Sequence, residues 1–266
     1  MQLVDTNRYP LDRLESAGGR AFVRNCAESF NATGALVLPG FLTSNAVASI
    51  MAEVSVRVDQ AFFCRREHNV FLDDGLVGID AMDPRVRPLR TSVGSIANDL
   101  LESDGASQQL YDWPALTQFI GSVLGYSDFY RGADPLGALS INVYGDGDIH
   151  EWHFDESAFT VTIMIQEAER GGHFEFVPGM RTDHAVDLDA IKRVLDGDET
   201  QVQRLLFGAG SLSIFGGRNT MHRVTEVGGD RHRLVPVLTY DTAPGSINST
   251  AVRELFWGRR AATLIG

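Results

Sequence analysis

A histidine and an aspartate stand two residues apart in the segment IHEWHFDESAFTVTIMIQ, residues 149–166. In an extended strand, side chains two residues apart point to the same side, so His153 and Asp155 converge there. Later in the chain, His222 stands at the start of another strand-like segment and supplies a second imidazole. Two histidines and one carboxylate are typical of a non-haem iron(II) site, because three protein ligands leave positions open for a co-substrate and dioxygen.

The pattern of a histidine, any residue and an aspartate, here His153 to Asp155, is a weak signal by itself, since such triplets also occur on protein surfaces. Neighbouring residues strengthen it. Asn142 and Tyr144 alternate along one face of an upstream segment, and Arg231 follows the second histidine in GGDRHRLVPV. A guanidinium binds a carboxylate through two parallel hydrogen bonds, so a buried arginine beside the metal would suit the distal carboxylate of 2-oxoglutarate.

Short strands joined by turns must position these side chains. From about residue 136 the chain alternates apolar and polar residues in segments separated by Gly, Asp and Pro, which predicts an antiparallel sandwich or barrel. The segments are ALSINVYG, FTVTIMIQ, GHFEFVPG, GSLSIFGG, HRVTEVG and HRLVPVLTY, with one predicted helix, DLDAIKRVL, among them. We therefore expect an all-β core with added helices, arranged as a double-stranded β-helix, or jelly roll.

The N-terminal part is predicted to be mainly helical. Helical spacing of apolar residues predicts helices in LDRLESAGGRAFVRNCAESF and in LTSNAVASIMAEVSVRVDQAFF, the second with Thr43 or Ser44 as its N-cap. GALVLPGF is predicted to be a short strand, SVGSIANDLL and WPALTQFIGSVLG are predicted to be two more helices, and the polar segment 64–95 fits no element. We expect a single domain over 1–266, with a mainly helical part at 1–135, the jelly roll at 136–245 and a C-terminal segment at 246–266.

Composition limits the kinds of partner. The net charge of −12 weighs against nucleic acid or an anionic membrane, because both attract cationic surfaces, and favours a small molecule. The opening residues MQLVDTNRYPLDRL lack the apolar core of a signal peptide, so we expect a cytoplasmic protein. Cys26 and Cys64 have no metal-like spacing and are expected to be free thiols. The sequence gives no sign of the oligomeric state.

These segments, taken in order, resemble iron(II)/2-oxoglutarate-dependent dioxygenases. The likeness covers residues 33–60 and 136–242, through TGALVLPGFLTSNAVASIMAEV near the start and WHFDE, GGHFEFVPGMR and GSLSIFGGRNTMHRVTEV in the core. It implies that His153, Asp155 and His222 are the ligands of Fe(II), with 2-oxoglutarate and O2 as co-substrates.

The resemblance also implies residues that contact 2-oxoglutarate. Asn142 and Tyr144 match a pattern whose side chains touch the co-substrate, although a packing role fits them nearly as well. Arg231 matches the arginine for the distal carboxylate by its spacing. Many relatives carry a serine or threonine two residues after that arginine, where this chain has Arg233, so both arginines stay candidates, with Arg231 favoured.

A narrower resemblance concerns the bacterial branch of free-amino-acid hydroxylases and lysine-type radical halogenases, and the block HEWHFDESAFTVTIMIQEAERGGHFEFVPGMR carries it. In those halogenases a glycine replaces the metal-binding carboxylate, so that chloride can enter. This chain keeps Asp155, and the resemblance therefore implies hydroxylation of a free amino acid or a similar small polar metabolite, with release of succinate and CO2. By position in that branch, four residues are candidates for substrate binding: Arg90, His150, Glu156 and Trp257.

Simpler interpretations stand beside these assignments. His150 and Glu156 could be solvated loop residues, Arg90 is one of several neighbouring arginines, and Trp257 could be a core aromatic. His68 is expected to be exposed to solvent. Two other functions stay open: the same cofactors could give desaturation, cyclisation or C–C cleavage, and a cupin-like jelly roll could hold a structural metal or none.

Overall fold

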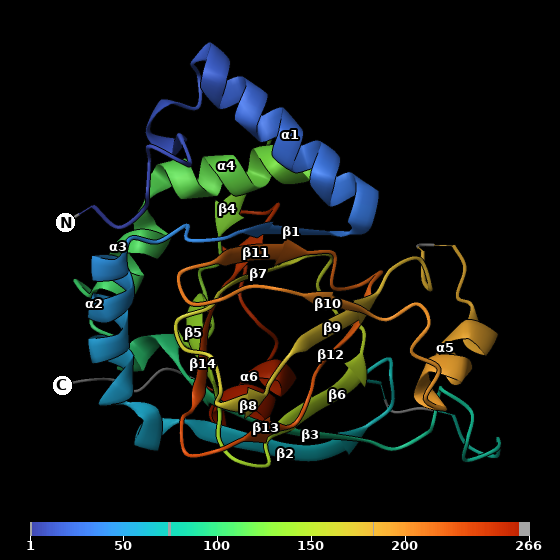
Figure 1. The fold of residues 1–266 in the computed structure, drawn as a ribbon. Helices are drawn as coiled ribbons and strands as arrows, with labels where there is room; N and C mark the ends of the chain where they lie inside the picture. The colour runs from blue at the N-terminus through green and yellow to red at the C-terminus, as the bar shows by residue number, and fades with distance from the viewer. Residues whose placement is uncertain (1, 74–75, 183, 261–266) are drawn as a thin grey trace.

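One large antiparallel sheet forms the centre of the computed structural model, which describes residues 2–73, 76–182 and 184–260 (Figure 1). The 11-stranded sheet has the order β1-β11-β7-β14-β5-β3-β6-β12-β9-β10, with β2 paired to β3. It curls into a nearly closed barrel, so the predicted jelly roll is confirmed. Its strands are β1 (Ala35–Leu38), β2 (Phe62–His68), β3 (Leu89–Ile96), β5 (Leu139–Tyr144), β6 (Ile149–His153), β7 (Thr160–Ile163), β9 (Phe174–Val177), β10 (Gln203–Leu205), β11 (Leu212–Phe215), β12 (Met221–Val224) and β14 (Arg233–Leu238).

Two short strand pairs and six α-helices complete the part of the chain that the structure describes. The pairs are β4 (Tyr130–Arg131) with β15 (Tyr240–Asp241) and β8 (Arg170–Gly171) with β13 (Val227–Gly228). The helices are α1 (Ala17–Thr33), α2 (Ser44–Ser55), α3 (Ala106–Asp112), α4 (Pro114–Leu124), α5 (Leu188–Leu195) and α6 (Thr250–Trp257). Within the described ranges, none of these helices is both long enough and apolar enough to span a bilayer.

Local chemistry explains where the N-terminal helices begin and end. The Ser16 side chain accepts a hydrogen bond from the backbone N–H of Gly19, which caps α1, and Gly34 ends the helix with a φ of 74° that favours glycine. The predicted cap at Thr43 is confirmed, because its hydroxyl accepts from the backbone N–H of Ala46 at the start of α2. Pro114 opens α4, where its missing N–H costs nothing.

The helices cover one face of the sheet. In Figure 1, α1 and α4 lie above β1, β11 and β7. Apolar side chains on that outer face of the strands, among them Leu36, Val161 and Ile214, belong to the same buried cluster as Phe119 and Ile120 of α4. Removing this apolar area from water stabilises the contact between helices and sheet.

The opposite face of the strands lines the inside of the barrel. Tyr144, Phe174 and Phe215 form part of a second buried cluster there. The interior also holds polar groups, since the hydroxyls of Thr162 and Ser213 lie 2.7 Å apart on neighbouring strands. The barrel interior therefore mixes aromatic and hydroxyl side chains, in contrast to the apolar outer face that packs against the helices.

The prediction of a helix in SVGSIANDLL was wrong. These residues form the end of β3 and a 3-10 turn at Asn98–Leu100. Because the second half of β3 is buried on both faces, its sequence is a nearly continuous apolar run, which periodicity cannot separate from a buried helix. Gly94 marks the strand: a Cβ there would lie 2.9 Å from the Phe63 ring on β2.

The segment 64–95, left without assignment, contains most of the β2–β3 pair. The second N-terminal helix also ends earlier than predicted, at Ser55, and the residues after it lead into β2. The N-terminal part therefore contributes β1, β2 and β3 to the main sheet. The predicted strands of the C-terminal half and the helix α5 are confirmed.

One buried carboxylate, that of Asp134, helps to hold the C-terminal segment against the barrel. Asp134 accepts hydrogen bonds from the backbone N–H groups of Leu136, Gly137 and Asn248, and from the Arg253 guanidinium of α6. Burial opposes ionisation, but these donors hold the pKa of Asp134 below its usual value. The segment therefore keeps α6 against β2 and β3.

Candidate active site

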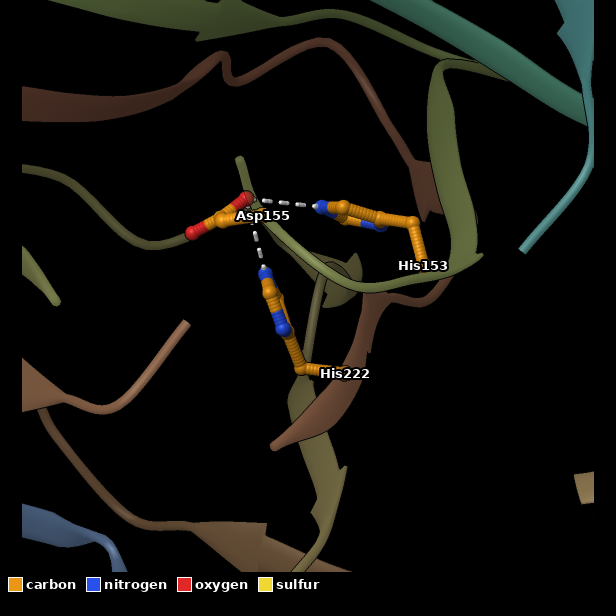
Figure 2. A group of neighbouring side chains, drawn as sticks. All are labelled: His153, Asp155 and His222. Atoms are coloured by element: carbon orange, nitrogen blue, oxygen red, sulfur yellow. Dashed lines mark ion pairs between the residues drawn. The ribbon is translucent and has the colours of Figure 1, made fainter. Parts of the chain in front are cut away.

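The predicted triad is assembled in the structure (Figure 2). His153 ends β6 and His222 lies in β12, and the two are register partners on adjacent strands. Asp155 follows two residues beyond the end of β6, and its Oδ1 lies 3.5 Å from Nε2 of each histidine. All three ligand atoms lie within 4.8 Å of one another, close enough to share one metal ion. His153 and Asp155 thus converge as alternation predicted, although only the histidine belongs to the strand.

Backbone carbonyls fix both imidazole rings. Nδ1 of His153 lies 2.8 Å from the carbonyl oxygen of Glu151, and Nδ1 of His222 lies 2.8 Å from that of Thr220. A carbonyl can only accept, so each Nδ1 carries a proton and each Nε2 is the nitrogen that faces Asp155. This is the arrangement in which histidine binds a metal through Nε2 while its other nitrogen holds the ring in place.

Asp155 is held from two sides. Its backbone N–H donates to the carbonyl of Gly217, and the hydroxyl of Thr160 donates to its Oδ2 at 2.6 Å. Gly217 leaves room for the carboxylate, because a Cβ at that position would lie 2.3 Å from Oδ2. The oxygen that faces the histidines, Oδ1, is therefore the one free to bind a metal.

Electrostatics favour the protonation states that a metal needs. Burial and the neighbouring His222 lower the pKa of His153 to about 4. Burial opposes ionisation of Asp155, but His222 and His153 hold the pKa of that carboxyl well below its usual value. At neutral pH the site offers a neutral His153 imidazole beside a carboxylate, and this donor set fits Fe(II).

The structure separates the two candidate arginines. Arg231 is exposed, lies before β14 and donates to the backbone carbonyls of Glu167 and Ala168. Arg233 is the first residue of β14 and is only 3% exposed. The buried arginine inside the barrel is therefore Arg233. Arg231, which the spacing favoured, is exposed.

Arg233 has no hydrogen-bond or ion-pair partner among the residues that the structure describes. Its guanidinium lies 5.2 Å from the centre of the Tyr144 ring, a contact between register partners on β14 and β5. Its Nε is buried without a hydrogen-bond partner, and no described carboxylate forms an ion pair with it. Burial lowers the pKa of Arg233. A buried, unpaired guanidinium is costly unless an anion joins it, so a ligand carboxylate could be accommodated at this position.

Asn142 lies on the same strand as Tyr144 and is half-buried. Its register partners are Val235 on β14 and Ser95 on β3. The side chains of Asn142 and Tyr144 therefore share the inner face of β5, as the alternation of the segment predicted.

His150 reaches His153 of the triad because β6 is irregular. Between His222 and Val224 the pairing of β12 with β6 shifts register, so that Val224 faces His150. The extra residue in β6 puts His150 and His153, three positions apart, on one face, where their rings stack 3.7 Å apart. His150 is half-buried, so the interpretation as a solvated loop residue is wrong.

The other three substrate candidates lie apart from one another. Arg90 is exposed and pairs with Glu226 on the outside of the sheet. Glu156 is exposed, and its carbonyl accepts from Arg218. Trp257 is buried in a small cluster under α6, and its Nε1 donates to Ser95 Oγ at 3.0 Å.

Sequence reasoning missed His68. It was expected in solvent, but it is half-buried in β2, and its ring lies 6.1 Å from that of His153 and 5.9 Å from that of His150. Its Nδ1 lies 2.8 Å from the carbonyl of Asn69, and its Nε2 lies 2.7 Å from Thr91 Oγ1. FFCRREH shows no alternation of apolar and polar residues, so no periodic signal marks this strand or the side chains that face inward.

A jelly roll with a His–Asp–His triad and a buried arginine beside it defines the iron(II)/2-oxoglutarate-dependent oxygenase superfamily, and the predicted superfamily is confirmed. More narrowly, the chain belongs to the Halogenase D family, whose model matches residues 19–254. No curated protein matches the chain in sequence.

Solved structures show the same fold. The epimerase SnoN, in complex with Fe3+, alpha ketoglutarate and nogalamycin RO, is 20% identical with a TM-score of 0.56, over 83% of this chain and 84% of SnoN. HygX from Streptomyces hygroscopicus, with nickel, 2-oxoglutarate and hygromycin B bound, is 13% identical with a TM-score of 0.54, over 84% of this chain and 88% of HygX. The carbocyclase SnoK from nogalamycin biosynthesis is 14% identical with a TM-score of 0.54, over 82% of this chain and 83% of SnoK.

Proposed function

We propose that the protein is an iron(II)/2-oxoglutarate-dependent oxygenase that hydroxylates a C–H bond of a free amino acid or a similar small polar metabolite. In the overall reaction, substrate, 2-oxoglutarate and O2 give hydroxylated substrate, succinate and CO2. The observation that carries the proposal is the triad of His153, Asp155 and His222, together with a buried arginine that has no partner in the described part of the chain. SnoN and HygX, which share the fold, were both solved with 2-oxoglutarate bound, which is also called alpha ketoglutarate. This agrees with the proposed cofactor set.

Each part of the site has one task. His153, Asp155 and His222 would hold Fe(II), which, once bound with 2-oxoglutarate and O2, supplies the oxidising power for the C–H bond. Arg233 and Tyr144 would bind the distal carboxylate of 2-oxoglutarate, and this assignment replaces Arg231 because only Arg233 is buried and unpaired. The buried position of Arg233 also keeps water from competing for that carboxylate.

Further residues would line the two ends of the pocket. Asn142 would contact 2-oxoglutarate from the inner face of β5. On the substrate side, His150 is best placed, because it stacks on the metal histidine. Trp257 would close the barrel beside Ser95. We leave Arg90 and Glu156 outside the proposed pocket, since both side chains are exposed and Arg90 pairs on the outer face.

Halogenation is the second candidate, and the match to the Halogenase D family favours it. In radical halogenases of the branch that this chain resembles, a glycine stands where Asp155 stands here. Asp155 is held in its place in the triad, because the Thr160 hydroxyl donates to its carboxylate and its own backbone N–H donates to the carbonyl of Gly217. A carboxylate in that position excludes chloride by occupying its place and by its negative charge, so hydroxylation is the better proposal.

Succinate formation tests the proposal. The purified protein is incubated with Fe(II), 2-oxoglutarate and O2, and succinate is measured with each of the protein amino acids and with simple derivatives. We expect that one class of compound stimulates succinate formation and that omission of iron or O2 abolishes it. A His153→Ala variant that forms succinate as fast as the parent protein would refute the proposal.

A further inference from the structure

The strand that carries His153 has one residue more than the strand beside it. His153 pairs with His222 on β12, whereas His150 pairs with Val224. Three steps along β6 therefore match two steps along β12, and the surplus residue falls between the two histidines of β6. A bulge of this kind leaves backbone groups that cannot complete the regular ladder.

The pairing of β6 with its other neighbour stops at the same place. The last register pair between β6 and β3 is His150 with Thr91. One residue further along, Glu151 would face Arg90, but the ladder ends before this position. Glu151 therefore lies where β6 falls out of step with β12 and stops pairing with β3.

The side chain of Glu151 takes the place of its backbone carbonyl between the strands. In an antiparallel ladder, a carbonyl accepts from a backbone N–H of the neighbouring strand. The carbonyl oxygen of Glu151 instead lies 2.8 Å from Nδ1 of His153. The backbone N–H of Arg90 donates to the carboxylate of Glu151. One residue thus fixes the imidazole with its backbone and holds the adjacent strand with its side chain.

The second histidine of the triad needs no such substitution. Nδ1 of His222 lies 2.8 Å from the carbonyl oxygen of Thr220, which directly precedes β12. The backbone N–H of Thr220 donates to the carbonyl of Gly216 in the preceding turn. Because Thr220 lies outside the strand, its carbonyl is not taken from a ladder. A replacement acceptor is therefore required only for the residue that fixes His153.

The guanidinium of Arg90 contacts a different carboxylate. It pairs with Glu226 at 2.8 Å, and both side chains are exposed. Exposed ion pairs of this kind contribute little to stability. Arg90 is thus contacted by two carboxylates, one at its backbone N–H and one at its side chain, and the second supplies a matched control for the first.

We propose that Glu151 is a positioning residue for His153: its carboxylate closes the strand pair at the bulge and so leaves its carbonyl free to fix the imidazole. The inference rests on the proposed function and adds a side chain that acts on Fe(II) binding through His153. Without the carboxylate, the carbonyl of Glu151 would be drawn back toward the N–H of Arg90, and Nδ1 of His153 would lose its acceptor.

Three variants test this role by anaerobic equilibrium titration with Fe(II). Glu151→Met keeps the length of the side chain but has no strong acceptor, Glu151→Gln keeps an amide oxygen, and Glu226→Met removes the exposed carboxylate. We expect about tenfold weaker binding for Glu151→Met, since residues that orient metal ligands contribute factors of this size. Glu151→Gln and Glu226→Met should both bind Fe(II) as the parent protein does.

A second measurement uses the metal-free protein. In Glu151→Met, the Nδ1 proton of His153 should exchange with solvent faster than in the parent protein, as followed by NMR of the imidazole nitrogens. The Nδ1 proton of His222, which Thr220 holds, should be unaffected. A purely structural role of Glu151 would lower the temperature of thermal unfolding and leave both the exchange rates and the affinity for Fe(II) unchanged.

Two results would overturn the inference while leaving the proposed function in place. One is equal affinity for Fe(II) in the folded Glu151→Met and Glu226→Met variants. The other is a Glu151→Gln variant that binds as weakly as Glu151→Met, because charge rather than the acceptor would then be responsible. Failure of the proposed function gives a different result, since the parent protein would form no succinate from 2-oxoglutarate with any compound.

Discussion

The guanidinium of Arg233 lies over the ring of Tyr144, its register partner, 5.2 Å from the ring centre, inside the barrel and without an ion-pair partner among the described residues. Arg231, two residues earlier, is exposed and donates to backbone carbonyls. We propose that Arg233 binds the incoming carboxylate, whereas Arg231 bonds to the carbonyls of a neighbouring loop.

This difference predicts opposite results from two matched substitutions. Arg233→Gln should raise the 2-oxoglutarate concentration needed for half-maximal succinate formation by about 10- to 100-fold, because it removes charge-assisted hydrogen bonds from a buried site. Arg231→Gln should change that concentration by less than about threefold, as expected for an exposed side chain. If the two variants behaved alike, or if Arg231→Gln had the larger effect, the assignment of the carboxylate site to Arg233 would be wrong.

The hydrogen bond from Thr160 to Asp155 predicts a role in metal binding. Thr160→Val keeps the shape of the side chain but removes the donor that holds Oδ2. We expect Fe(II) to bind about tenfold more weakly to this variant, and Thr160→Ser to restore binding, since residues that orient metal ligands contribute factors of this size.

Thr162→Val is the matched control for that substitution. Thr162 lies on the same strand and bonds to Ser213 rather than to the triad. Equilibrium titration with Fe(II) under anaerobic conditions measures all three variants. Equal affinities for Thr160→Val and Thr162→Val would show that Thr160 does not position Asp155.

The buried carboxylate of Asp134 predicts how stability depends on pH. The pKa of Asp134 in the folded state lies below the usual value. Its contribution to the free energy of unfolding is therefore fully present above the pKa of an aspartate in the unfolded chain, about 4, and is lost as the pH falls through the folded-state pKa. At neutral pH, Asp134→Ala should lower the free energy of unfolding by about 3 kcal/mol, because it leaves the Arg253 guanidinium without its partner.

Urea denaturation at neutral pH and at about pH 3 measures this effect. Asp12→Ala serves as the control, since the Asp12–Arg13 pair is exposed and should contribute less than about 1 kcal/mol. A loss for Asp134→Ala that was as large at acidic as at neutral pH would contradict the role of the charged carboxylate.

Asp155 predicts the product formed in the presence of halide. With excess chloride in the assay, the oxidised product should contain no chlorine, because the carboxylate takes the position that a halide would need. Mass spectrometry reads the result directly from the isotope pattern of chlorine. Chlorination at a rate comparable to oxygenation would show that the family name Halogenase D describes the activity of this chain.

The triad could be predicted from sequence because it depends on local rules. Alternation along a strand placed His153 and Asp155 together, and the second histidine, His222, stood at the start of a recognisable strand. The strands of the C-terminal half alternate clearly, since one face packs against helices and the other lines the barrel.

Other features depend on where strands begin and how they pair. Arg231 and Arg233 stand two residues apart, so alternation along a strand cannot tell which of them is buried. Only the start of β14 at Arg233 separates them. His150 faces His153 because of a register shift, which no periodicity reveals. The β2–β3 pair could not be predicted, because its inner face is completed by strands that are distant in the chain.

One measurement tests the central claim without knowledge of the substrate: the visible absorption of the protein on anaerobic addition of Fe(II) and then 2-oxoglutarate. When 2-oxoglutarate chelates an iron(II) ion held by the triad, a charge-transfer band appears, and it should saturate at one equivalent of each component. The band should be absent from a folded His222→Ala variant. A parent protein that shows no band, or an undiminished band in that variant, would contradict the assignment of His153, Asp155 and His222 as the ligands of iron.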